Sequence, residues 1–236
     1  MKYSKAYLQE MGLWPVYRAK THSLAEPVAA PISSEIGANN GREDIMQMDW
    51  PALKQTVRQC CACGLRAGCT QTVFGVGDEN ADWLFVGEGP GAEEDQRGEP
   101  FVGQAGRLLD NMLAAIDLKR GENVYIANIV KCRPPGNRNP EASEAAQCEP
   151  YLARQIELIQ PKLIVALGKV AAANLLATDA PIGMLRGKVH QYRGIALIAT
   201  YHPAYLLRSL TDKAKAWADL CFARRTIGES RTSQNA

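Results

Sequence analysis

Short, largely apolar runs alternate along this sequence with segments of helical periodicity, and few folds accommodate that alternation. The runs cover residues 83–86, 124–130, 163–167 and 195–200. A strand that is apolar throughout is covered on both faces, which is typical of a parallel sheet packed between helices. We therefore predict an α/β fold with a central, mostly parallel β-sheet flanked by helices on both faces.

Apolar periodicity predicts helices between and around these strands, at residues 50–59, 105–118, 143–159, 169–176 and 212–225. Asp49 and Ser143 stand where N-caps are expected, and Pro51 suits the first turn of its helix. We place the main α/β domain at residues 49–226 and a frayed tail at 227–236.

The N-terminal region divides into two parts. Residues 1–20 predict an amphipathic helix of unknown role, and residues 21–48 carry the prolines, glycines and small polar residues of a flexible linker. The helix is either a packing element or a docking peptide for a protein partner, with Trp14 as its anchor.

Composition limits the protein's surroundings. An apolar fraction of 46%, a charged fraction of 22% and a net charge of +2 are ordinary for a soluble globular protein. No apolar run is long enough to span a membrane, and the N-terminus lacks the apolar core of a signal peptide. We expect a cytoplasmic, monomeric protein that does not interact with a membrane.

The loop at residues 87–103 joins a buried strand to a helix and is rich in glycine and carboxylates. It lacks the lysine of a Walker A loop and the third glycine of a dinucleotide fingerprint. Its carboxylates would also repel phosphate at close range. Because the carboxyl ends of parallel strands meet at one edge, we expect Glu88, Glu94, Asn128, Asn137 and His202 to share one cleft.

The cysteines suggest a metal centre. Their total of seven is odd, and a reducing compartment disfavours disulfides. Cys60 and Cys63 form a Cys-x-x-Cys pair that could act with Cys132 and Cys148. Four thiolates suit either tetrahedral zinc or an iron–sulfur cluster, and spacing leaves both open.

The segment after His202 carries an apolar pair, Leu206 and Leu207, followed by Arg208. Such a pair could wedge into a base stack. It could equally begin a helix and pack inward.

Three segments together resemble the family 4 uracil-DNA glycosylases, the iron–sulfur branch of their superfamily. They are Gly-Glu-Gly-Pro-Gly-Ala-Glu-Glu-Asp at 87–95 with Pro-Phe-Val-Gly at 100–103, Asn-Ile-Val-Lys-Cys-Arg-Pro-Pro-Gly-Asn-Arg at 128–138, and His-Pro-Ala-Tyr-Leu-Leu-Arg at 202–208. The resemblance covers about residues 57–225. It implies a glycosylase domain at 49–226 that flips uracil out of DNA, hydrolyses its N-glycosidic bond and so begins base-excision repair.

The resemblance also implies site roles. A [4Fe–4S] cluster is held by Cys60, Cys63, Cys132 and Cys148. Uracil is bound by Glu88, Gly89, Phe101, Asn128 and His202, with the loop backbone holding one oxygen. His202 stabilises the departing base, and Glu94, or else Asn137, positions water. Contacts to single- or double-stranded DNA fall to Arg133, Arg138, Leu206, Leu207 and Arg208.

Two other functions remain open at this stage. One is a non-catalytic iron–sulfur protein that binds DNA as a replication accessory, although intact Asn128 and His202 argue against it. The other is a glycosylase that prefers a different deaminated base.

Overall fold

The predicted apolar runs form the centre of the sheet in the computed structural model, which describes residues 37–234. The sheet has six strands in the order β1-β3-β2-β4-β6-β5. The strands are β1 Val76–Gly77, β2 Trp83–Gly87, β3 Val124–Asn128, β4 Leu163–Leu167, β5 His190–Tyr192 and β6 Ile195–Thr200.

The inner strands β3, β2, β4 and β6 are parallel, whereas β1 and β5 pair antiparallel at the two edges. The chain passes from β2 to β3 on one side and reaches β4 and β6 on the other. Crevices for ligands form where strand order reverses in this way. The carboxyl ends of β2 and β4 therefore mark the expected site.

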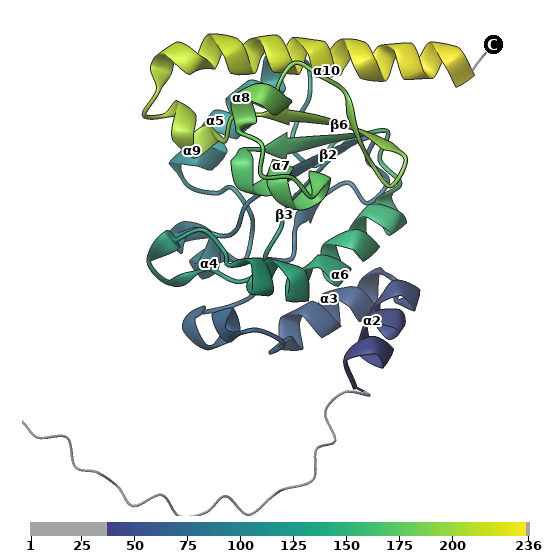
Figure 1. The fold of residues 1–236 in the computed structure, drawn as a ribbon, viewed down its shortest axis with the longest axis vertical. Helices are drawn as coiled ribbons and strands as arrows, with labels where there is room; N and C mark the ends of the chain where they lie inside the picture. The colour runs from purple at the N-terminus through teal and green to yellow at the C-terminus, as the bar shows by residue number, and fades with distance from the viewer. Residues whose placement is uncertain (1–36, 235–236) are drawn as a thin grey trace, which may run out of the picture. The chain divides into compact units, whose positions relative to one another are not determined.

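Helices cover both faces of the sheet (Figure 1). The longer ones are α2 Gly37–Gln47, α3 Trp50–Gln59, α5 Gln104–Ala114, α6 Ala142–Ile159, α7 Lys169–Leu176 and α10 Lys213–Gln234. The shorter ones are α4 Ala92–Arg97, α8 Ile182–Leu185, α9 Pro203–Leu206 and the 3-10 turns η1 Gly64–Gly68, η2 Pro135–Asn137 and η3 Leu210–Asp212. Among residues 37–234, no helix has the length and apolarity needed to cross a bilayer.

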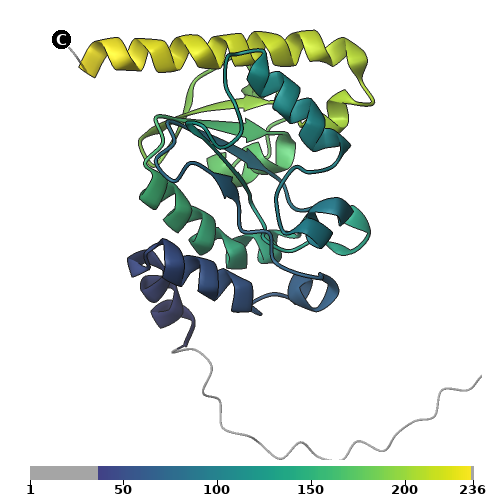
Figure 2. The same cartoon turned by 180° about the vertical axis from the view of Figure 1, so that it is seen from behind.

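Alternate residues of each inner strand feed two separate cores. In β2, Leu84 and Val86 pack with residues of α3, α6 and α7, while Trp83 and Phe85 pack with residues of α5 and α10. Figure 2 shows the second face, with α10 crossing above α5. Because both faces of each strand are buried, the sequence has no polar alternation there. The predicted α/β fold with helices on both faces is confirmed.

Three local expectations are wrong. Helix α2 occupies part of the predicted linker at 21–48 and packs against α6, and the unit of which it is part begins at Gly37. Helix α10 runs to Gln234, so the tail predicted as frayed is helical up to that residue. The loop at 87–103 contains helix α4, whose acidic first turn favours a helix N-terminus. The helix predicted at residues 1–20 lies outside the described residues.

The predicted N-cap of α3 is confirmed, whereas the predicted N-cap of α6 is wrong. Asp49 caps α3 by accepting a hydrogen bond from the Ala52 N–H at 3.0 Å. Helix α6 is capped by Glu141, two residues before the predicted cap Ser143. Glu144 accepts a hydrogen bond from the N–H of the N-cap residue Glu141 at 2.8 Å.

Candidate active site and cysteine pocket

A cleft opens at the carboxyl ends of the inner strands, as the sheet topology predicts. Its walls include the five side chains expected to converge: Glu88, Glu94, Asn128, Asn137 and His202. Gly89, Phe101, Arg138 and Arg208 line it as well. The predicted convergence is confirmed, although these residues come from segments more than a hundred positions apart.

Asn128, the last residue of β3, forms the buried floor of the cleft. Its side chain is only 2% exposed. Within the described part of the chain, its Oδ1 atom has no hydrogen-bond partner. A Cβ atom on Gly87 would lie 2.4 Å from that oxygen, so glycine is required beside it. A buried amide oxygen left without a partner is costly, which suggests that a ligand satisfies it.

Phe101 supplies an aromatic wall beside this amide. The residue is 6% exposed, and its ring centroid lies 5.4 Å from that of His202 at an interplanar angle of 31°. A Cβ on Gly87 would also lie 2.6 Å from the Phe101 Cζ atom. The Phe101 ring and the Asn128 amide therefore both lie against Gly87, an arrangement that suits a planar heterocycle.

His202 caps helix α9 and faces the cleft in a defined tautomer. Its Nδ1 accepts a hydrogen bond from the Ala204 N–H at 3.1 Å, which leaves the proton of the neutral ring on Nε2. Burial, aided by the Arg208 charge and opposed by Glu94, lowers the pKa of His202 to about 4. The imidazole is therefore neutral near pH 7 and can donate from Nε2.

The Glu94 carboxylate organises the loop around the cleft. Oε2 accepts from the Gly91 N–H at 3.1 Å, and Oε1 accepts from the N–H groups of Val102 and Gly103 at 2.9 and 3.1 Å. These bonds join the start of α4 to the segment after Phe101. An ionised carboxylate has about four acceptor sites, so one remains for another donor.

The other acidic and amide groups of the cleft are less constrained. Burial raises the pKa of Glu88, and its backbone carbonyl accepts from the Val130 N–H at 3.2 Å. Asn137 is exposed, with its Oδ1 accepting from Arg133 Nε at 2.7 Å.

The candidate DNA-contacting residues differ in their exposure and in whether they already pair with another side chain. Arg208 is exposed at the rim of the cleft. Arg138 forms a bidentate pair with Glu144, at 2.8 and 2.7 Å. Leu206 is only 1% exposed, so the inward-packing alternative describes it and the wedge prediction does not. Helix α9 turns Leu206 toward the core while Leu207 stays 40% exposed.

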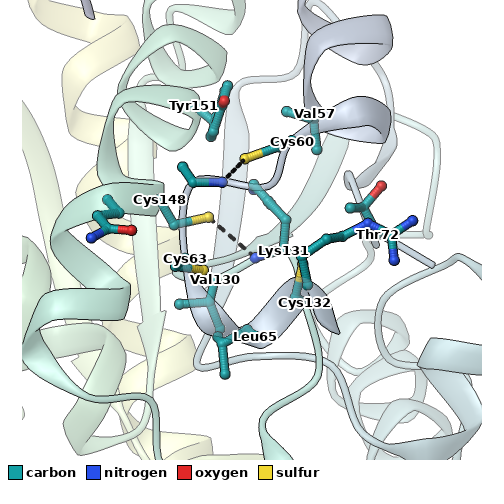
Figure 3. Close-up of a pocket in the computed structure, with 13 residues that line it drawn as sticks. Val57, Cys60, Cys63, Leu65, Thr72, Val130, Lys131, Cys132, Cys148 and Tyr151 are labelled. Carbon is teal, nitrogen blue, oxygen red and sulfur yellow. Dashed lines mark hydrogen bonds between the residues drawn. The ribbon is translucent and has the colours of Figure 1, made fainter. Parts of the chain in front are cut away.

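A second pocket brings together the four cysteines predicted to act as a set (Figure 3). Cys60 ends α3, Cys63 precedes η1, Cys132 follows β3, and Cys148 lies in α6. The walls between them are mostly apolar, with Val57, Leu65 and Val130 among the lining residues. Sequence-distant thiols therefore converge on one enclosed space.

Backbone N–H groups point at two of these sulfur atoms. The Ala62 N–H donates to Cys60 Sγ at 3.5 Å, and the Lys131 N–H donates to Cys148 Sγ at 3.3 Å. Burial raises the pKa of Cys148 to about 11, with the Lys131 charge opposing it, and raises the pKa of Cys132 as well. Thiolates in this pocket thus require a strongly electropositive partner.

The remaining cysteines are not among the residues that line this pocket, although the Cys69 side chain lies beside Cys132. Cys61 is exposed, Cys69 is half-buried beside Arg66, and Cys221 lies in α10. Across the described residues, no three Cys, His, Asp or Glu side chains are arranged to hold a single metal ion.

Lys131 is a functional candidate that sequence reasoning missed. It is fully buried, and its Nζ donates to the Asn128 carbonyl at 3.1 Å and to Gln155 Oε1 at 2.6 Å. Burial lowers the pKa of Lys131 to about 8, against a smaller opposing effect of Cys148. The signal was a lysine between Val130 and Cys132 in an apolar run, which is unusual for a solvated side chain.

Comparisons with known proteins agree with this geometry. A family model described as the uracil DNA glycosylase superfamily matches residues 74–221. The type-4 uracil-DNA glycosylase of Archaeoglobus fulgidus is 47% identical over 159 residues, covering 64% of this chain and 79% of the relative. That of Thermotoga maritima is 42% identical over 74% of this chain and 89% of its own length. A type-5 uracil-DNA glycosylase of Pyrobaculum aerophilum is 34% identical over 55% of this chain and 64% of its own.

Proposed function

Because the chain belongs to the uracil-DNA glycosylase superfamily, we propose that it removes uracil from DNA by hydrolysing the N-glycosidic bond. One observation carries this proposal: the buried Asn128 amide, unpaired at Oδ1 within the described residues, opens into the cleft that holds Phe101 and His202. A base inside a duplex cannot reach such a floor, so the target must flip out of the stack. The product is an abasic site that starts base-excision repair.

Uracil fits the donor and acceptor pattern of this pocket. Asn128 Oδ1 accepts from uracil N3–H, and the amide nitrogen of the same side chain donates to O4. Phe101 stacks on the base. Backbone N–H groups of the segment Glu88–Gly91, which includes Gly89, hold a further uracil oxygen. The same carbonyl-rich edge is absent from cytosine, whose N4 group is a donor.

We assign the departure of the base to His202. Bond cleavage places negative charge on uracil O2, and the Nε2–H group donates to that oxygen. A neutral donor is sufficient because the stabilisation is electrostatic and is larger in a pocket that excludes water.

Water must reach the sugar carbon from the opposite side. We propose that the remaining acceptor site of Glu94 orients this water and that its charge stabilises the cation-like sugar. Three backbone N–H groups hold the carboxylate in place for this task. Asn137, steadied by Arg133, is the alternative water ligand.

We further propose a [4Fe–4S] cluster bound by Cys60, Cys63, Cys132 and Cys148. Four buried or half-buried thiols surround a cavity, which suits a body larger than one ion. Four thiolates also suit tetrahedral zinc, and the resemblance to the iron–sulfur branch is what favours the cluster. When bound, the cluster would supply structural cross-linking of α3, the β3 turn and α6.

Substituting Cys148 with serine is expected to lower cluster content and thermal stability together. The variant should lose the brown colour and most of its bound iron and sulfide, because a buried ligand is lost. Cys221→Ala is the matched control, since that thiol lies in α10 and not in the pocket. A colourless Cys148→Ser protein with unchanged melting temperature would contradict the assignment.

The DNA-facing part of the proposal involves Arg208, Arg133, Arg138 and Leu207. Arg208 is the first choice for a phosphate contact because it is exposed at the cleft rim. Leu207 is the wedge that fills the space left by the flipped base. We also propose that the enzyme is monomeric and cytoplasmic, and its free cysteines suit a reducing compartment.

Alanine substitutions at the two adjacent leucines should separate folding from DNA binding. Leu206→Ala removes a buried side chain and should lower the free energy of unfolding by about 2–5 kcal/mol. Leu207→Ala removes an exposed one and should weaken binding to uracil-containing duplex with little change in stability. Denaturant unfolding and binding titrations measure the two effects. Equal losses of stability would remove Leu207 from the wedge role.

The function itself is tested by incubating the purified protein with an oligonucleotide that contains one uracil. Release of free uracil and an alkali-labile abasic site are expected without added nucleotide. Single-stranded and duplex substrates, with hypoxanthine and xanthine in parallel, define the base range. Tight DNA binding with no base release would instead identify a non-catalytic DNA-binding protein.

A further inference from the structure

We propose that Arg120 is a positioning residue that holds Phe101 in the conformation needed to stack on uracil. The inference rests on the proposed function and deepens it, because it concerns the same pocket. Arg120 lies between α5 and β3, outside the cleft-lining residues. It acts through the backbone of Phe101 and not through the substrate.

The Phe101 backbone needs such support. Its φ angle is 55°, in the left-handed region that residues other than glycine rarely adopt. Strained conformations of this kind persist only where the surrounding structure over-determines them, and they gather at functional sites. Relaxing φ to negative values would reorient the peptide and move the ring away from Gly87 and His202.

Arg120 clamps the two carbonyls that flank the strained residue. Nη1 donates to the Pro100 carbonyl at 2.9 Å, and Nη2 donates to the Phe101 carbonyl at 2.8 Å. Nε donates to Asp110 Oδ1 at 2.9 Å, which fixes the guanidinium on helix α5. The Arg120 side chain is 22% exposed, so these bonds are partly shielded from water.

Two further contacts close the same segment from other sides. Glu94 accepts from the N–H groups of Val102 and Gly103, directly after Phe101. Gly106 of α5 lies so close that a Cβ there would be 1.7 Å from the Phe101 carbonyl oxygen. The carbonyl is thus pressed against α5 and held by Arg120, so the peptide cannot turn over.

A lysine could not replace this clamp. The planar guanidinium presents several N–H donors in a fixed fork, whereas an ammonium is a point charge on a flexible stem. Only the fork can hold two consecutive carbonyls while a third N–H stays on Asp110. The geometry therefore calls for arginine specifically.

A double-mutant cycle tests the role. Arg120→Met should lower kcat/KM for uracil release by about tenfold, the scale of a lost base–aromatic stack. Its inhibition constant for free uracil should rise by a similar factor. In a Phe101→Ala background the same substitution should change kcat/KM by less than about twofold, because interacting residues are non-additive. Arg224→Met is the control, since Arg224 pairs with Asp117 on the surface at 2.8 Å.

The outcomes separate the two proposals. Wild-type protein that releases no base contradicts the proposed function. Active wild type with an Arg120→Met variant of unchanged kcat/KM and uracil inhibition contradicts the positioning role, and so do additive effects in the cycle. If Arg120→Met fails to fold, Arg120→Lys and Asp110→Asn carry the same test. They should impair uracil inhibition by about threefold with melting temperatures close to wild type, a smaller effect because part of the bonding remains.

Discussion

The His202→Ala variant is expected to release uracil about 100- to 1000-fold more slowly than wild type. The imidazole Nε2–H is the donor aimed at the oxygen that gains charge as the base departs. Because the ring lies in a buried cleft, water cannot replace it with an equally preorganised donor. The rate of release under saturating substrate is the measurement, since the donor acts in the transition state.

The fold should survive this substitution. Among residues 37–234, the ring's one hydrogen bond comes from the Ala204 N–H to Nδ1, and loss of a cap typically costs about 1 kcal/mol. His190→Ala is the matched control, because His190 lies on edge strand β5 and its Nε2 pairs with the Leu185 carbonyl at 2.8 Å. Equal rate losses in both variants would remove His202 from the proposed role.

The pH profile of the wild type gives an independent reading of the same residue. With a pKa of about 4, the His202 ring stays neutral from pH 8 down to about 5, and its protonation should affect kcat/KM only as pH approaches 4. A free histidine would instead titrate near 6.5. Since the unfolded chain binds this proton first, His202 also makes folding stability fall as pH drops from about 6.5 to about 4. If the wild-type pH profile has a midpoint at pH 6.5, and the His202→Ala profile lacks that midpoint, the neutral imidazole is contradicted.

The sheet could be predicted because its information is local. Each inner strand corresponds to a short, largely apolar run in the sequence. Burial of both strand faces follows from that composition. The edge strands β1 and β5 were missed because they are short and only partly buried. Helix α2 was missed because its glycines and asparagines give little intrinsic preference for a helix. Its contact with α6 stabilises a segment whose own sequence does not.

The convergence of the site could be predicted for a topological reason, because the carboxyl ends of parallel strands share one edge. The finer contacts could not. Arg120 reaches carbonyls 19 and 20 positions earlier in the chain, and Lys131 reaches Gln155 across 24. Nor does the sequence say which of Leu206 and Leu207 faces outward, because both are leucines in one helical turn. Such contacts depend on packing between elements and leave no periodic signal.

Asn128→Ala is expected to lower kcat/KM for uracil release by about 100-fold without lowering stability. Two hydrogen bonds to the base are lost, and a net contribution of about 1.5 kcal/mol each corresponds to roughly two factors of ten. The unfolding free energy should stay constant or rise. An unpaired buried oxygen costs about 1–3 kcal/mol, and the described residues offer Oδ1 no partner. Asn128 therefore serves ligand binding and lowers the unfolding free energy of the unliganded enzyme.

Asn123 provides the matched control at the other end of the same strand. Its Oδ1 accepts from the Asp82 N–H at 2.6 Å, and its φ of 55° lies in the left-handed region that asparagine tolerates better than alanine. Asn123→Ala should therefore lower the unfolding free energy by about 1–2 kcal/mol while kcat/KM stays within about twofold of wild type. Asn128→Ala should therefore lower activity without lowering stability, whereas Asn123→Ala should lower stability with little change in activity. If Asn128→Ala instead loses stability and keeps its discrimination of uracil from cytosine, the amide is a structural element and another group reads the base.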